Sequence, residues 1–188
     1  MPSSTVHTLK ITLRKVRPPV WRRIVVPSEI KLSALAPVLE AAMGWIGGHL
    51  HEFEAGGKRY GDPDPDWDDD VIDELGRKLA GLLPRVGEKM RFDYDFGDGW
   101  EHDVIVEAIE PAERNVAYPV CLAGKRAGPP DDCGGPWGYG KLLAALADPK
   151  HPDDEDRVEW IGEEFDPEHF DAAETTAAMQ MSRPLGRW

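Results

Sequence analysis

The residues best suited to chemistry gather around one glycine turn, at residues 97–99. Carboxylates beside a histidine can bind a divalent metal ion or transfer protons, and an adjacent indole can form the wall of a pocket. The same residues also fit a purely structural hairpin, because Asp-Gly is common turn chemistry and outward-facing acids are solvated. The candidate functional cluster consists of Asp95, Asp98, Trp100, Glu101 and His102.

A second group of residues is suited to a zinc ion. Structural zinc sites use four Cys, His or carboxylate ligands, usually with some of them closely spaced. Cys121 and Cys133 stand twelve positions apart, which is no recognised zinc spacing, and they could instead be free thiols or form one disulfide. Aligned histidines on a strand and small cysteines in a core are also common structural outcomes. The candidate ligands for a divalent metal such as zinc are His49, His51, Cys121 and Cys133.

A loop rich in glycine and proline, residues 124–140, is a third candidate. Its composition usually indicates disorder, but Trp137 and Tyr139 supply large apolar surfaces that would favour packing against a sheet. We therefore predict an ordered element over residues 121–139 with Trp137 buried, so that Trp137→Ala would cost roughly 3–5 kcal/mol. The rival interpretation is that Trp137 and Tyr139 face solvent and bind a peptide or protein partner.

The charge of the chain is uneven. The net charge of −13 opposes non-specific binding to DNA or RNA, because it repels their phosphates. Residues 1–28 nevertheless carry six basic residues and no acid, so Arg22 and Arg23 are candidate nucleic-acid contacts. The competing interpretation, which we favour, is that these basic strands lie against acidic neighbours within one fold.

Strands must position most of these residues. Apolar and polar residues alternate along residues 9–13, 90–96 and 100–109, which is the period-2 pattern of half-buried strands. The turn at 97–99 would join the last two in a hairpin, and Gly56-Gly57 would form the turn of another. That second hairpin pairs residues 50–55 with 58–60, and a further strand is expected at residues 20–26.

Helices are expected mainly toward the C-terminus. One runs from Ser33, as its N-cap, to residue 43, and others lie at residues 137–147, near 158–161 and from Asp171 onward. Because strands come first and helices gather late, the expected fold is α+β, with a mostly antiparallel or mixed sheet built from hairpins and helices packed on one face. A single domain would span residues 1–188, with its core at about residues 5–176.

Membrane association is not expected. Lys10, Arg14 and Lys15 interrupt any apolar signal-peptide core, and no stretch approaches the ~18–20 apolar residues that cross a bilayer. We therefore expect a cytoplasmic location and no membrane partner.

Several longer motifs occur in one order along most of the chain: residues 17–23 (RPPVWRR), 43–45 (MGW), 49–53 (HLHEF), 94–102 (YDFGDGWEH) and 129–139 (PPDDCGGPWGY). By these motifs the chain resembles the Ri-plasmid ORF-three-like family, the plasmid pRiA4b ORF-3-like proteins. The resemblance implies an α+β fold and a largely uncharacterised function, with some relatives carried by mobile elements under a transposon-passenger or resolvase-type label. It also implies that many relatives have a cysteine where this chain has Gly128.

The residues give little support to recombination chemistry, since no serine belongs to a recognisable nucleophile motif. We therefore expect a non-catalytic binding or accessory module, tied to mobile elements by ancestry, with a protein or peptide partner. Two alternatives stay open. One is a metal-dependent hydrolase or nuclease that uses the acidic hairpin, and the other is a DNA-binding protein that uses the basic N-terminal strands.

Overall fold

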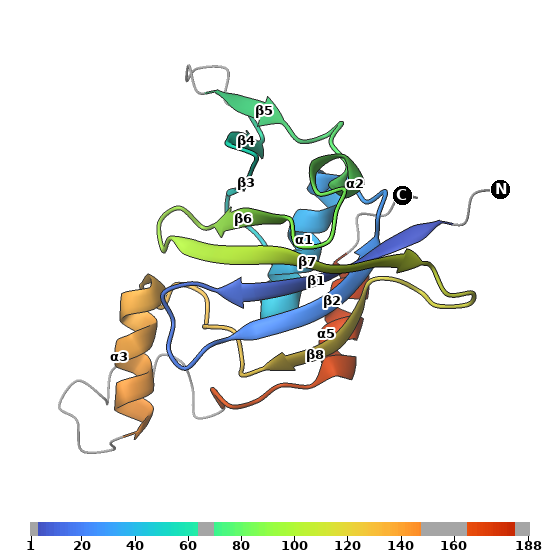
Figure 1. Cartoon of the computed structure of the whole chain (residues 1–188). Coiled ribbons are helices and arrows are strands. Elements are labelled where there is room, and N and C mark those ends of the chain that lie inside the picture. The colour runs from blue at the N-terminus through green and yellow to red at the C-terminus, as the bar shows by residue number, and fades with distance from the viewer. Residues whose placement is uncertain (1–3, 64–69, 148–164, 183–188) are drawn as a thin grey trace.

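The computed structural model, which describes residues 4–63, 70–147 and 165–182, is organised around one sheet. Its strands are β1 (Thr5–Leu13), β2 (Trp21–Pro27), β3 (His51–Ala55), β4 (Lys58–Gly61), β5 (Val71–Asp73), β6 (Lys89–Tyr94), β7 (Trp100–Pro111) and β8 (Val120–Lys125). They form an eight-stranded sheet in the order β5-β4-β3-β6-β7-β1-β2-β8, shown in Figure 1. Every neighbouring pair is antiparallel except β4 and β5, which are parallel. The expected mixed, mostly antiparallel sheet of an α+β fold is confirmed.

Strands β6 and β7 form the central hairpin that the alternating pattern predicts. Phe92 and Tyr94 on β6 and Val104 and Val106 on β7 are buried, because side chains alternate between the two faces of a strand. The prediction is wrong at its end, where β6 stops at Tyr94 and Phe96 is exposed. Asp95 takes a left-handed φ of 52°, so the turn begins one residue after Tyr94.

Within the residues that the structure describes, the helices beside the sheet are α1 (Leu32–Met43), α2 (Leu79–Leu82), α3 (Gly135–Ala147) and α5 (Ala172–Met181). Helices α1 and α5 lie side by side on one face, and α3 stands beyond the ends of β1 and β2 (Figure 1). The apolar side of α1 joins residues of β1, β2, β6 and β7 in one buried cluster. Within the described residues, no helix is both long enough and apolar enough to span a membrane.

The start of α1 differs from the prediction. The helix begins at Leu32 after Lys31, and Ser33 lies inside it rather than at its N-cap. Lys31 pairs with Lys78 in an isolated bridge, and the Leu32 N–H donates to the Arg77 carbonyl oxygen at 2.9 Å. Because this tertiary contact satisfies an N-terminal donor, the helix start does not depend on a serine cap. Its predicted end is confirmed, since Gly44 is the left-handed C-cap with a φ of 94°.

The C-terminal helix starts where the capping pattern places it. The Asp171 carboxylate accepts hydrogen bonds from the Ala173 and Glu174 N–H groups at 2.7 and 2.8 Å. Helix α3 begins at Gly135, two residues before its predicted start. The helix expected near residues 158–161 lies outside the described residues.

Candidate functional site

Segments that lie far apart in the sequence meet at one end of the sheet. Tyr94, at the end of β6, pairs with His51 of β3 on one side and with Trp100 of β7 on the other. The Asp95 N–H donates to the Leu50 carbonyl oxygen at 2.9 Å, which holds the segment before β3 against the hairpin turn. Helix α3 also begins here. Its first residue, Gly135, lies so close to the hairpin turn that a Cβ atom at this position would be 2.2 Å from the Asp98 carbonyl oxygen.

Trp45, which directly follows the C-cap of α1, organises this end of the sheet. Its ring stacks on Tyr94 at a centroid distance of 5.0 Å and meets His102 edge-on at 5.5 Å. Its indole N–H donates to the Pro129 carbonyl oxygen at 2.8 Å. Trp45 therefore joins α1, the sheet and the loop that precedes α3. Sequence reasoning did not single it out, because only its place in the MGW motif distinguished it.

One group of three side chains has the geometry of metal ligands: His49, Asp95 and Asp132, here called the His–Asp–Asp group. One ligand atom from each lies within 4.8 Å of the others. The Asp95 Oδ1 atom accepts hydrogen bonds from the Gly97 and Asp98 N–H groups at 3.0 and 3.3 Å. Its Oδ2 atom lies 3.6 Å from His49 Nδ1. Of the predicted ligand and acidic residues, the structure therefore unites His49 with Asp95 and adds Asp132.

The surroundings of this group are strongly acidic. Burial raises the pKa of the Asp131 carboxyl, and the nearby carboxylates of Asp132, Asp95 and Asp98 raise it further, although His49 opposes them. The Asp98 Oδ2 atom is buried without a hydrogen-bond partner among the described residues. The site thus concentrates negative charge at the end of the sheet.

His51 belongs to a separate buried cluster. Its Nε2 atom lies 3.1 Å from Glu74 Oε2, and its Nδ1 atom lies 3.7 Å from Glu40 Oε1. Burial alone lowers the pKa of His51, but the hydrogen bond and charge of Glu74, with the charge of Glu40, outweigh burial and raise it. Burial also raises the pKa of Glu40. Glu74 is within hydrogen-bonding distance of His51 Nε2 and Glu40 lies farther away near Nδ1, and the group with metal-ligand geometry around His49 does not include His51.

The cysteines do not join the histidines. The Cys121 thiol, on β8, lies 3.6 Å from the Ala123 carbonyl oxygen, and burial raises its pKa. No disulfide joins Cys121 to Cys133. Among the described residues, the group with metal-ligand geometry contains His49 but not His51, Cys121 or Cys133. The predicted four-ligand zinc set is therefore not assembled in this fold.

The candidate residues of the acidic hairpin lie in different environments, some in ion pairs and others buried in the core. Glu101 pairs with Arg14 at 2.9 Å and with Lys15. His102 is fully buried, and its Nδ1 atom lies 3.0 Å from the Phe92 carbonyl oxygen. Burial lowers the pKa of His102 to about 4. Trp100 is buried beside Trp45, at a centroid distance of 5.8 Å. Only Asp95, of the five hairpin candidates, contributes a ligand atom to the His–Asp–Asp group.

Both candidate nucleic-acid contacts are engaged within the protein. Arg22 is buried, and its guanidinium donates to the carbonyl oxygens of Ala42, Trp21 and Lys125. Burial lowers the pKa of Arg22 to about 10, so the group stays protonated at neutral pH. Arg23 forms a two-point ion pair with Glu107 across the sheet. Arg22 and Arg23 thus have carbonyl and carboxylate partners within the fold.

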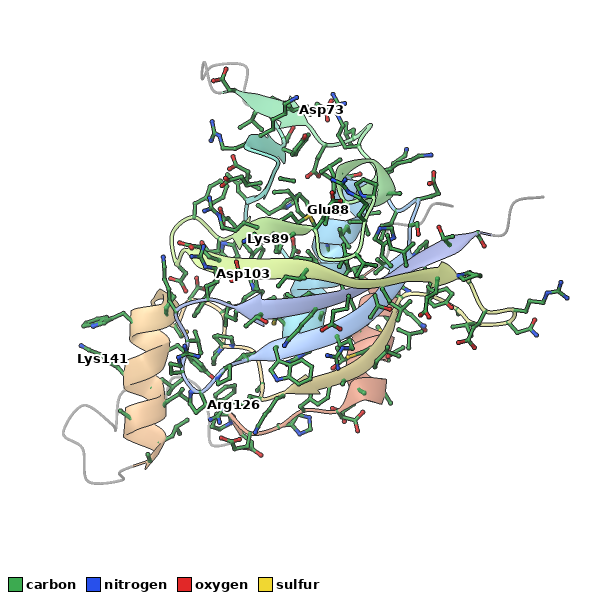
Figure 2. All side chains as sticks on the ribbon, in the orientation of Figure 1. Asp73, Glu88, Lys89, Asp103, Arg126 and Lys141 are labelled. Atoms are coloured by element: carbon green, nitrogen blue, oxygen red, sulfur yellow. The ribbon has the colours of Figure 1, made fainter. Side chains whose placement is uncertain are left out.

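The two aromatic residues of the glycine-rich loop have opposite positions. Tyr139 is 1% exposed and packs edge-on against Trp100, whereas Trp137 is 71% exposed. The expected burial of Trp137 is wrong, because the buried residues of α3 recur at helical spacing (135, 138, 139, 142 and 145) and leave residue 137 outside that face. The Lys141 ammonium lies 3.5 Å from the centroid of the Trp137 ring, on the side of α3 that faces away from the sheet (Figure 2).

A cleft of about 430 Å³ adjoins this end of the sheet. The end of α1, residues 127–131 and helix α5 form its walls. Its apolar lining includes Trp45, Pro129, Phe165 and Phe170, and its carboxylates are Asp131, Asp171 and Glu174. Arg22 also contributes to the lining, with its guanidinium carbon 4.9 Å from the centroid of the Phe170 ring. Asp131 borders the cleft, and the next residue, Asp132, belongs to the His–Asp–Asp group.

Gly128 allows the cleft wall to run directly against α1. A Cβ atom at this position would lie 1.8 Å from the Met43 carbonyl oxygen, so no side chain fits without backbone movement. The cysteine that the family resemblance implies here would therefore need a different local backbone.

The family comparison agrees with these motifs. The plasmid pRiA4b ORF-3-like protein family matches residues 5–174. The chain belongs to this family. This pRiA4b ORF-3-like chain is 44% identical over 160 residues to an uncharacterized protein, y4hQ, of Sinorhizobium fredii (strain NBRC 101917 / NGR234), covering 85% of the chain and 82% of that relative.

A solved structure has the same fold as this pRiA4b ORF-3-like chain. It is the crystal structure of a protein of unknown function, MM3350, from Methanosarcina mazei Go1. The two superpose with a TM-score of 0.85 at 37% sequence identity, covering 92% of the present chain and 98% of the other. Neither relative is described with an activity.

Proposed function

We propose that this pRiA4b ORF-3-like chain is a non-catalytic binding module whose cleft takes a basic segment of a partner peptide. The observation that carries the proposal is the combination of aromatic walls with carboxylates in the cleft beside α5. A volume of about 430 Å³ falls within the size range of ligand sites in proteins. Aromatic faces and carboxylates together favour an arginine or lysine side chain next to an apolar residue.

The electrostatics of the cleft support a cationic ligand. Residues 41–44 bring the partial negative charge of the α1 C-terminus to the cleft. The N-terminus of α5 also lines the cleft, and its partial positive charge is offset by the Asp171 carboxylate that caps it. The guanidinium of Arg22, which could attract an anion instead, is already bound by three carbonyl oxygens. The net charge of −13 would also steer basic partners toward the molecule.

The test is calorimetric titration of the full chain with three short peptides: acetyl-Phe-Arg-Phe-amide, its Gln analogue and its Glu analogue. We expect the Arg peptide to bind measurably, the Gln peptide more weakly and the Glu peptide not at all. Glu174→Gln should weaken binding of the Arg peptide about tenfold, since it removes one cleft carboxylate.

Glu113→Gln, at an exposed position outside the cleft lining, is the matched control and should bind as the unaltered chain does. Equal binding of all three peptides, or equal loss in the two variants, would contradict recognition by the cleft.

A further inference from the structure

We propose that His49, Asp95 and Asp132 bind a divalent first-row transition metal ion. This site lies beyond the peptide-binding cleft and does not depend on a partner. The three residues come from three separate segments, namely the stretch before β3, the turn after β6 and the loop before α3. The fold brings one ligand atom of each within 4.8 Å of the others.

The distances suit a shared ion better than direct bonding between the side chains. His49 Nδ1 and Asp95 Oδ2 lie 3.6 Å apart, which is too long for an N–H···O hydrogen bond. Two ligand atoms that each bind a metal at about 2.0–2.2 Å stand roughly 3–4 Å apart. The observed separation of nitrogen and oxygen therefore matches two corners of a coordination sphere.

The backbone prepares Asp95 for this role. Its positive φ of 52° and the two hydrogen bonds accepted by Oδ1 fix the carboxylate and leave Oδ2 directed toward His49. A ligand that is already oriented loses less conformational entropy when the ion binds.

A buried hydroxyl group beside the site provides an independent observation. Tyr94 is 1% exposed, and its hydroxyl has no hydrogen-bond partner of good geometry among the described residues. Its ring meets the His49 ring edge-on, at a centroid distance of 5.7 Å and an angle of 89°. Buried polar atoms in proteins normally have partners. Tyr94 therefore places a buried hydroxyl without such a partner beside one of the three proposed ligands.

The negative charge around the site also favours binding of a cation. In the described part of the chain, Asp98, Asp131 and Asp132 form no ion pair with a lysine or arginine, and the ion pair of Asp95 is with His49. Carboxylates held close together repel one another. A bound divalent ion would offset the repulsion between these carboxylates.

The ligand types indicate the class of metal. An imidazole suits zinc, iron, copper and nickel, whereas the all-oxygen sites of calcium and magnesium lack nitrogen ligands. Three protein ligands leave at least one coordination position for water or another ligand. Zn²⁺ and Co²⁺ are therefore the appropriate probes, the second because its visible absorption reports coordination geometry.

The test uses the full chain without a histidine tag, with all metal first removed by a chelator. Calorimetric titration with Zn²⁺ should give one ion per chain, and Co²⁺ should produce a visible absorption band. His49→Gln, Asp95→Asn and Asp132→Asn should each weaken Zn²⁺ binding about tenfold or more. Asn at position 95 can keep the turn hydrogen bonds and the left-handed backbone, so this variant should fold.

Two control variants separate the site from general surface charge. Asp103→Asn, on β7 (Figure 2), and His169→Gln, beside α5, remove a carboxylate and an exposed imidazole that lie outside the group, and both should bind Zn²⁺ normally. Circular dichroism of each variant shows whether it is folded. The proposal is overturned if the folded chain binds no Zn²⁺ below millimolar concentration, or if the site variants bind it as tightly as the controls.

Discussion

The Trp45 indole N–H donates a hydrogen bond to the Pro129 carbonyl oxygen at 2.8 Å, although 84 positions separate the two residues. The bond ties the end of α1 to the loop that carries Asp131 and Asp132. It therefore fixes one wall of the cleft and one ligand of the His–Asp–Asp group at the same time.

Trp45→Phe should lower the free energy of unfolding by about 1–3 kcal/mol. Phenylalanine can keep part of the stacking on Tyr94, but it leaves the buried Pro129 carbonyl oxygen without its donor. Urea denaturation followed by circular dichroism measures this change. Trp137→Phe is the matched control at an exposed position, and a similar loss in both variants would show that the hydrogen bond has no specific role.

Trp137→Ala should change the free energy of unfolding by less than about 0.5 kcal/mol. The ring is 71% exposed and lies against the Lys141 ammonium. Tyr139→Ala, two residues later, should cost roughly 3–5 kcal/mol, because that ring is buried against Trp100. Urea denaturation of the two variants should rank them in this order, and the reverse ranking would contradict the orientation of α3.

Stability should decrease as the pH falls from 6.5 toward 4. Burial holds the pKa of His102 at about 4 in the folded chain, against 6.5 for an unperturbed histidine. The unfolded chain therefore binds a proton on His102 in this window that the folded chain does not, and acid favours unfolding. The expected loss is about 3 kcal/mol at pH 4 relative to neutral pH.

Urea denaturation at several pH values, compared between the unaltered chain and His102→Gln, isolates this effect. Glutamine can still donate to the Phe92 carbonyl oxygen but does not titrate. The difference in stability between the two proteins should shrink as the pH falls. A difference that stays constant with pH would show that His102 is protonated equally in both states.

Gly128→Ala should destabilise the protein by more than about 2 kcal/mol, because its Cβ atom would overlap the Met43 carbonyl oxygen at 1.8 Å. Gly140→Ala is the matched control in α3, where a Cβ atom meets nothing within 4 Å. That control should stabilise the protein by about 0.5–1 kcal/mol, since alanine is a better helix former than glycine. Equal melting temperatures for the two variants would contradict the close approach of residue 128 to α1.

Duplex DNA should not bind measurably at physiological ionic strength. Arg22 is buried and Arg23 is paired with Glu107, so neither offers a free cation to phosphate. Fluorescence anisotropy with a labelled duplex, at low and at physiological salt, measures this directly. Micromolar binding at physiological salt, abolished by Arg23→Glu, would contradict the prediction.

Local pattern was sufficient for much of the fold. The alternation along β6 and β7 predicted the hairpin, and Asp171 predicted the start of α5, because both signals act between near neighbours. The prediction of Ser33 as the N-cap was wrong because residues 77 and 78, which are far along the chain, contact the start of the helix. The predicted burial of Trp137 was wrong because its exposure depends on which face of α3 packs against the rest of the protein.

The candidate site was predictable only in part. Asp95 and His49 were singled out by residue type, but their partner Asp132 lies in a loop whose path depends on the tertiary fold. The pairing of His51 with Glu40 and Glu74 likewise joins a strand, a helix and a loop that no sequence spacing connects. Residue types therefore indicated which side chains could bind a ligand, but only the fold showed which of them lie close together.

The contact between Trp45 and Pro129 also has a consequence for the order of assembly. Strands β1 to β7 and helix α1 all precede residue 112, whereas the loop that completes the cleft and the His–Asp–Asp group comes afterwards. A chain emerging from the ribosome can pair most of its sheet before that loop exists. The binding surfaces are therefore expected to mature last, on a framework that has already folded.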